Sequence, residues 1–192
     1  MQIVGPDDMK IEYPEIGVCG LSCRFCPNYQ TSSRNQCAGC KSEGRMKVGC
    51  SFITCAVKKR GIEFCWQCQE HENCEKWSER RKWGQSHDSF VCYQRLEENI
   101  AFVKRLGLSA FAKDQKAREQ LLTAMLAEFN EGRSKSFYCV VSTVMDLQEM
   151  TQAITQARNE SAGMDVRGKS RTLHLIINAI AGKRGYNLKL RK

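Results

Sequence analysis

The stretch that decides the fold begins with VCGLSCRFCPNYQ at residues 18–30, continues with CAGC at 37–40 and ends with CSFITCAVKKRGIEFCWQCQEHENCEKW at 50–77. It contains ten of the twelve cysteines of the 192-residue chain. They are Cys19, Cys23, Cys26, Cys37, Cys40, Cys50, Cys55, Cys65, Cys68 and Cys74. This density is far above that of an ordinary globular protein, so the structure of this segment depends on what the thiols bind.

Metal ligation is the interpretation that the compartment favours. The first residues include Asp7 and Asp8 and do not resemble a signal peptide. No uncharged apolar run reaches the ~18 residues of a membrane span. We therefore expect a cytoplasmic protein without a membrane span. In a reducing compartment, clustered thiols are typical of metal sites rather than of disulfides.

Three of the spacings are Cys-x2-Cys, beginning at Cys23, Cys37 and Cys65. Such a turn directs two thiolates to one ion, with each sulfur about 2.3 Å from zinc. The sequence therefore predicts zinc held at two four-cysteine sites, with all ten clustered cysteines as candidate ligands. Ten thiols exceed two such sites by two, so the spacing does not assign them.

An iron–sulfur centre is the alternative cofactor. The pair Cys26-Pro27 is typical of ferredoxin ligand runs, and a [4Fe-4S] cluster takes four thiolates. Cys19-x3-Cys23-x2-Cys26 is also the spacing by which radical S-adenosylmethionine enzymes hold their cluster. Those enzymes place it in a partial (β/α) barrel, whose strands this sequence lacks. Because the spacing of the three thiols still matches, redox or radical chemistry at Cys19, Cys23 and Cys26 is kept as the alternative function.

Composition divides the chain near residue 92. Leu, Ile, Val and Phe make up 15 of the first 92 residues but 25 of the last 100. A segment so poor in large apolar side chains needs stabilisation from a metal or from disulfides. We expect a mainly α protein: a small irregular cysteine-rich module stapled by metal at 1–84, and a helical bundle with a basic tail at 85–192.

Apolar periodicity predicts the helices of the second half. The first begins at Ser86 or Asp88 and closes at Gly107, and the second covers 114–130. A third, from Ser134, is apolar nearly all round, although its valines also permit a strand. Asp146, in a capping box with Glu149, and Asp165 cap the fourth and the fifth, and the fifth ends at Gly182. The tail YNLKLRK at 186–192 alternates like a short strand or an extended arm.

Charge points to a possible partner. The net charge is +9, and residues 93–192 carry 17 basic and 10 acidic side chains. A protein or RNA is therefore the expected partner, bound through the basic second half. The segment WSERRKW at 77–83 could stack on nucleic acid, but a helix with buried tryptophans explains it as well. No phosphate-binding loop, dinucleotide fingerprint, nucleophile elbow or zincin motif occurs, so the sequence assigns no enzymatic reaction.

The cysteine motifs resemble those of the DUF3795 family of small bacterial and archaeal cysteine-rich proteins. The resemblance covers residues 18–77 and includes the Cys-Gly-Leu-x-Cys-x-x-Cys opening, the Cys-x-Gly-Cys turn and the Cys-x-x-Cys-x5-Cys close. It implies an uncharacterised protein presumed to bind zinc. The family commonly has an apolar residue at the position of His71, so the resemblance does not support His71 as a ligand.

Three side chains have ordinary structural explanations. His71 stands in Cys65-x2-Cys68-x2-His71-x2-Cys74, a regular three-residue step that could serve one ion, but its place between Glu70 and Glu72 favours a side chain that faces solvent. Cys92 and Cys139 lie outside the cluster and are expected to be buried, unreactive thiols. The sequence thus predicts a metal-binding protein whose metals stabilise the fold and whose surface binds a protein or RNA.

Overall fold

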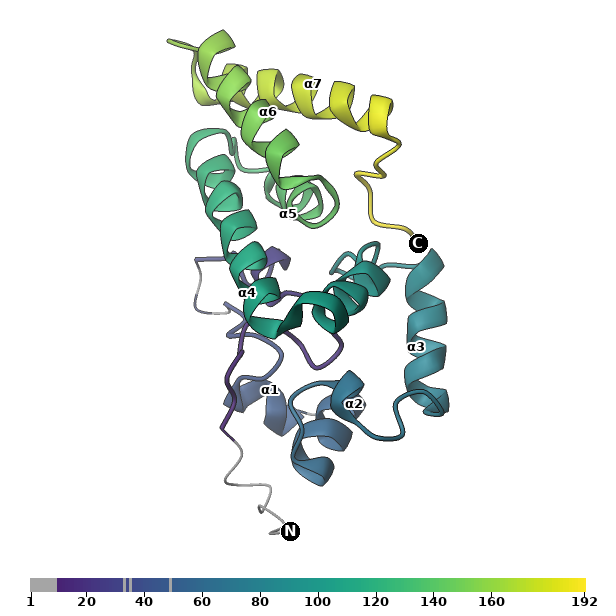
Figure 1. Cartoon of the computed structure of the whole chain (residues 1–192). Helices are drawn as coiled ribbons and strands as arrows, with labels where there is room; N and C mark the ends of the chain where they lie inside the picture. The colour runs from purple at the N-terminus through teal and green to yellow at the C-terminus, as the bar shows by residue number, and fades with distance from the viewer. Residues whose placement is uncertain (1–9, 33, 35, 49) are drawn as a thin grey trace.

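The computed structural model describes residues 10–32, 34, 36–48 and 50–192. Within these ranges the chain is mainly helical and contains no strand, only an isolated bridge between Ile16 and Ser22. The elements are η1 (Cys23–Phe25), α1 (Glu43–Val48), α2 (Ser51–Ile53), η2 (Thr54–Lys59), η3 (Cys65–Gln67), α3 (Glu75–Ser86), α4 (Leu96–Glu128), α5 (Lys135–Val144), α6 (Leu147–Glu160) and α7 (Val166–Arg184) (Figure 1). An irregular cysteine-rich region followed by helices is the predicted fold class, which is confirmed.

The helical half is built around α5. Tyr138 and Val141 of this helix are completely buried, so α5 is a core helix and not the strand that its valines also permitted. Leu122 of α4, Ala157 of α6 and Leu173 of α7 join it in one apolar cluster. Figure 1 shows α6 and α7 packed together at one end of the molecule, with α5 beneath them.

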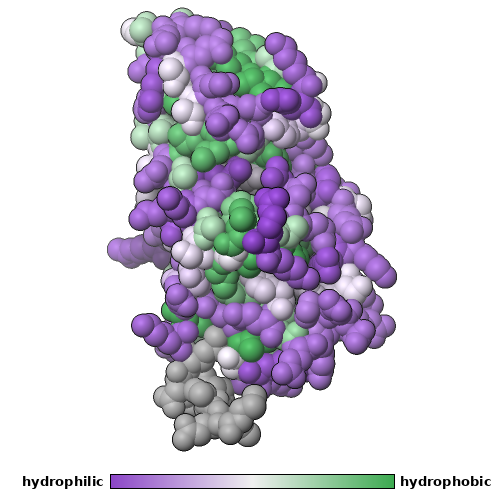
Figure 2. Space-filling view, in the orientation of Figure 1, coloured by the Kyte–Doolittle hydropathy of each residue, from purple (hydrophilic) through white to green (hydrophobic). Residues whose placement is uncertain are grey.

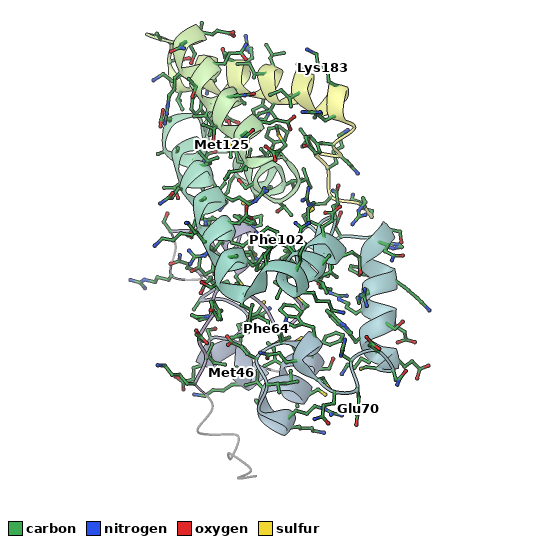
Figure 3. All side chains as sticks on the ribbon, viewed as in Figure 1. Met46, Phe64, Glu70, Phe102, Met125 and Lys183 are labelled. Carbon is green, nitrogen blue, oxygen red and sulfur yellow. The ribbon has the colours of Figure 1, made fainter. Side chains whose placement is uncertain are left out.

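The cysteine-rich half occupies the other end, where short elements pack beneath the first part of α4 (Figure 1). Its apolar clusters are small, and one of them joins Ile16 and Phe64 to Val103 and Phe111 of α4. Figure 3 labels Phe64 between α4 and the short helices. Both halves of the molecule therefore pack against α4.

Gly107 closes the first helical arm of α4, and this part of the sequence prediction is confirmed. It has φ of 84° and ψ of 165° and bends α4, so that one helical arm precedes it and a second follows. The second arm begins directly after Gly107 rather than at Asp114. Glycine takes this backbone conformation without strain, so it acts here as a kink.

The predicted start of the first arm is wrong, because α4 begins at Leu96 and not at Ser86 or Asp88. The Asp88 carboxylate is buried and accepts hydrogen bonds from the backbone N–H groups of Tyr93 and Arg191. A carboxylate committed to these donors cannot cap a helix beginning beside it. Asp88 instead joins segments far apart in the sequence.

The predicted caps of the last two helices are confirmed. Asp146 and Asp165 each accept hydrogen bonds from backbone N–H groups in the first turn of α6 and α7. The expected capping box is not formed, because Glu149 accepts hydrogen bonds from Arg184 and Tyr186 instead. α7 continues past Gly182 and ends at Arg184, and the following Gly185 caps it with a φ of 73°.

The tail after α7 is an extended arm. Leu188 and Leu190 pack against the core of the helical half. Arg191 then reaches back to the end of α3, where it donates to the Gly84 and Gln85 carbonyls and to Asp88. The arm therefore fastens the helical half to the segment that follows the cysteine-rich module.

No helix in the part of the chain that the structure describes is both long enough and apolar enough to cross a bilayer. Figure 2 shows hydrophilic side chains over most of the visible face, interrupted by hydrophobic patches.

Candidate metal centre

The loop around Cys19 is held against the segment that carries Cys65. The Cys65 backbone N–H donates a hydrogen bond to the Val18 carbonyl at 2.9 Å. Gly20 has φ of 88°, and a Cβ at this position would lie 2.7 Å from the Trp66 ring. Only glycine accommodates both this conformation and this close approach. The glycine after Cys19 therefore allows two distant cysteine motifs to pack together.

Two Cys-x2-Cys turns face each other, one carrying Cys23 and Cys26 and the other Cys37 and Cys40. The Cys40 backbone N–H donates to the Cys23 sulfur at 3.2 Å. The Cys37 N–H donates to the Asn28 carbonyl at 3.0 Å, which ties the second turn to the end of the first. Two facing turns of this kind are the usual way in which proteins present four thiolates to one zinc ion.

The protonation of these thiols depends on their mutual contacts. A hydrogen bond from the Cys23 thiol lowers the pKa of Cys40 to about 7. The same bond, together with burial, raises the pKa of Cys23. Burial raises the pKa of Cys26, and the nearby sulfurs of Cys37 and Cys40 add to the rise. A bound cation would stabilise the thiolate forms, and binding would release protons.

A cavity of about 280 Å³ joins these turns to the first loop. The six thiols that line it are Cys19, Cys23, Cys26, Cys37, Cys40 and Cys50. Apolar side chains such as Leu21, Phe52 and Val91 form much of the remaining wall. Arg45 and Arg80 also line the cavity, and their positive charge complements a site of several thiolates.

The remaining clustered cysteines, Cys55, Cys65, Cys68 and Cys74, lie beyond this cavity. Burial raises the pKa of Cys65 to about 12, and the sulfurs of Cys19, Cys55, Cys74 and Cys50 raise it further. Arg60 lies beside Cys55 and Cys68. Cys65 therefore has Cys55 and Cys74 near it, and it also lies near Cys19 and Cys50 of the cavity.

Among the residues that the structure describes, no group of three or more Cys, His, Asp or Glu side chains is positioned to hold one metal ion. All twelve cysteines are described, and all are free thiols. The structure thus gathers thiols around one cavity and brings some into contact, while complete four-ligand sets stay a prediction. The donor set consists of soft sulfur ligands and fits a thiophilic ion such as zinc.

The three residues outside the predicted ligand set lie as follows. The sequence analysis expected His71 to face solvent, but its side chain is only 22% exposed. Cys92 and Cys139 are buried as predicted, and burial raises the pKa of each thiol to about 12.

The aromatic and basic segment at 77–83 is helical and packs within the chain. Trp77 is buried. The Trp83 ring meets Tyr93 edge-on, and the Arg80 guanidinium lies 4.4 Å from the centre of the Trp83 ring. These rings are therefore occupied by contacts within the molecule.

Sequence reasoning missed a buried ion pair beside the second turn. Lys41 directly follows Cys40, and its ammonium group is 2.8 Å from Glu63 and 3.8 Å from the centre of the Phe64 ring. Glu63 also accepts a hydrogen bond from the Tyr13 backbone N–H at 2.8 Å. Only the charged residue after the Cys-x2-Cys turn gave any signal of this pair, because its partner lies 22 residues away.

The fold and the thiol cluster together define a cysteine-rich, mainly helical protein with a thiol-lined cavity. Residues 15–79, about a third of the chain, match the family DUF3795, described as a protein of unknown function. This match confirms the resemblance seen in the cysteine motifs, and all ten clustered cysteines fall within it. No curated protein and no solved structure matches the chain.

Proposed function

We propose that this protein binds zinc through its clustered thiols and that the metal stabilises the cysteine-rich half. The observation that carries the proposal is the single cavity lined by six thiols from four separate segments. Without a cation, bringing so many ionisable thiols together has no evident benefit, since burial and mutual repulsion oppose their ionisation. A thiophilic ion makes use of all of these ligands.

The first centre is assigned to Cys23, Cys26, Cys37 and Cys40, because the two turns that carry them are in direct contact. The second is drawn from the thiols at 55–74. This division leaves Cys19 and Cys50 beside the first centre, where both line the same cavity. In this proposal zinc acts as a cross-link between segments that share few apolar contacts.

Metal analysis of the full-length protein, purified without oxygen, tests the proposal. We expect two zinc ions per chain and no visible colour. Replacement of Cys23 by Ser should remove one ion, since it breaks the first centre. Cys139→Ala is the matched control, because this buried thiol lies in α5 and both ions should remain. A wild-type protein without bound metal would refute the proposal.

An iron–sulfur centre is the second candidate, and one observation favours it. Cys19, Cys23 and Cys26 all line one cavity, with Arg45 and Arg80 beside them. Three thiolates and neighbouring cationic side chains suit a cluster of net negative charge. Iron with equimolar sulfide and a brown colour in the purified protein would establish this candidate in place of zinc.

The proposal includes a partner surface on α7. Arg167, Arg171 and Lys183 are exposed, and none of them takes part in an ion pair among the described residues. Leu175, one turn after Arg171, is 67% exposed. A face that is both basic and apolar fits an acidic, amphipathic protein segment better than RNA, whose phosphates offer nothing to Leu175.

Fluorescence anisotropy of the full-length protein tests this surface with two probes, a synthetic helical peptide rich in Glu and Leu and a single-stranded RNA. We expect binding of the peptide, weakened by Arg171→Glu. Lys104→Glu on α4 changes the charge equally and should leave binding unchanged. Binding of the RNA alone, falling steeply as salt rises, would identify a nucleic-acid surface instead.

A further inference from the structure

The segment between Cys65 and Cys74 holds one imidazole in a fixed position. The Cys68 backbone N–H donates to the Cys65 carbonyl at 3.2 Å, and the His71 N–H donates to the Cys68 carbonyl at 3.1 Å. These successive three-residue turns place His71 between two candidate thiol ligands. Figure 3 labels the neighbouring Glu70 at the edge of the molecule, in the loop before α3.

The hydrogen bonds of the His71 ring define its tautomer. Its Nδ1 lies 2.8 Å from the Cys68 carbonyl oxygen. A carbonyl only accepts hydrogen bonds, so Nδ1 carries the proton. The other ring nitrogen, Nε2, therefore has a free lone pair in the neutral imidazole.

That lone pair has no use within the described part of the protein. The Nε2 atom is buried and has no hydrogen-bond partner there. The nearest carboxylate oxygen, on Glu72, is 3.7 Å away, which is too far for a hydrogen bond. A buried nitrogen acceptor without a partner is unfavourable, so its presence needs an explanation.

Metal ligation explains both ring nitrogens together. A metal-binding histidine usually donates its second N–H group to a carbonyl or carboxylate, which fixes the ring while the other nitrogen binds the ion. His71 has this arrangement already. Cys68, whose carbonyl accepts this hydrogen bond, lies three residues before His71, and Cys74 lies three residues after it. The ring thus lies between Cys68 and Cys74 in the sequence, with its Nε2 lone pair unpartnered in the described part of the protein.

We propose that His71 binds the second metal through Nε2, making that centre a three-thiolate and one-imidazole site. This inference rests on the proposed zinc-binding function. The thiolates come from Cys55, Cys65, Cys68 and Cys74, of which three suffice. Zinc accepts this ligand combination as readily as four thiolates.

Cobalt(II) substitution in the full-length protein tests the inference, because the visible bands of tetrahedral cobalt move to longer wavelength when nitrogen is replaced by sulfur. We expect His71→Cys to keep two ions and to shift these bands to longer wavelength. His71→Ala should weaken one of the two sites by about 100-fold or more, since even partners of ligands contribute 10–100-fold. His87→Ala, at an exposed position, is the control and should change nothing.

The outcomes separate this inference from the proposal on which it depends. Two bound ions with identical spectra and affinities in wild type, His71→Ala and His71→Cys would overturn the role of His71 and leave zinc binding standing. A wild-type protein that binds no metal would overturn both. The His71→Cys variant keeps a ligand at this position, so the test does not depend on folding of the alanine variant.

Discussion

A single buried ammonium group connects the second cysteine turn to the rest of the module. The Lys41 side chain is fully buried and donates to Glu63 and to the Tyr13 carbonyl. Burial lowers the pKa of Lys41, although Glu63 opposes this shift. Both charges are removed from water, so the loss of either one would leave the other buried without a compensating charge.

Lys41→Met should therefore destabilise the protein by about 3–5 kcal/mol, the usual cost of leaving one buried charge unpaired. Urea unfolding of the zinc-loaded protein, followed by circular dichroism, measures the change. Lys47→Met is the control, because Lys47 pairs with Glu43 on an exposed helix face and should cost less than about 0.5 kcal/mol. Equal effects of the two variants would contradict this account.

The candidate ligands could be predicted from spacing alone, since all ten cysteines stand in a recognisable pattern. Which of these cysteines meet one another in space could not be predicted. The contact between Cys23 and Cys40 and the packing of Gly20 on Trp66 join residues that are distant in the sequence. A Cys-x2-Cys pair specifies a local turn but carries no information about which other turn it meets. The regular step from Cys65 to Cys74 already offered His71 as a ligand, but the buried, unpartnered Nε2 atom that favours this role is visible only in the structure.

At the scale of elements, Gly107 determines the shape of α4. Its φ and ψ lie in a region that is essentially restricted to glycine, and a Cβ there would meet no atom within 4 Å. Gly107→Ala should cost about 1–3 kcal/mol through backbone strain alone. Gly182→Ala, within α7 and also in open space, should stabilise by up to about 1 kcal/mol. Thermal unfolding measures both, and a stabilising Gly107→Ala would show that the kink is not required.

A polar network joins the start of α5 to α7. Ser134 and Ser170 donate to Glu131 at 2.7 and 2.6 Å, and Ser134 Oγ lies 2.8 Å from His174 Nε2. Burial lowers the pKa of His174. Burial acts to raise the pKa of Glu131, but the hydrogen bonds from both serines outweigh it and lower that pKa to about 2.

This network predicts acid sensitivity. Around and below the ordinary histidine pKa of 6.5, the unfolded chain takes up a proton at His174 more readily than the folded protein does. The free energy of unfolding therefore decreases as the pH is lowered. The contribution of Glu131 is lost at lower pH, between 4.5 and about 2. Urea midpoints at about pH 7.5 and about pH 5.5 test the histidine. We expect a lower midpoint in acid and a smaller difference in His174→Gln; an unchanged difference would exclude His174.

The helices of the second half were largely predictable because their signals are local. Asp146 and Asp165 cap helices through N–H groups two or three residues away. Asp88 has the same side chain but serves a long-range contact, so the same local rule fails there. The end of the first arm at Gly107 was predictable as well, but the direct start of the second arm was not, because it depends on packing on both sides.

At the scale of the whole molecule, the two halves should differ in their dependence on metal. The apolar core of the helical half contains none of the ten candidate ligands, although Phe25 packs into it, whereas the cysteine-rich half has only small apolar clusters. A structural zinc site contributes about 10–16 kcal/mol of binding energy to folding. Chelation should therefore unfold residues 10–84 first.

Limited trypsin digestion of the chelated protein tests this expectation. We expect cleavage within the cysteine-rich half while a fragment containing α4 to α7 persists, with most of the helical circular dichroism signal retained. Restoring zinc before digestion should protect the whole chain. Simultaneous degradation of both halves would show that metal supports the entire fold.

The extended arm after α7 has a consequence for how the protein forms during synthesis. Arg191 binds Asp88 across 103 residues of sequence. At ribosomal rates of about 5–20 residues per second, Arg191 is therefore synthesised about 5–20 s after Asp88. During that interval the thiols of the cysteine-rich half are already synthesised and available to zinc. Under the proposed function, metal loading can thus precede closure of the arm, and the contact between Arg191 and Asp88 forms late in the maturation of the chain.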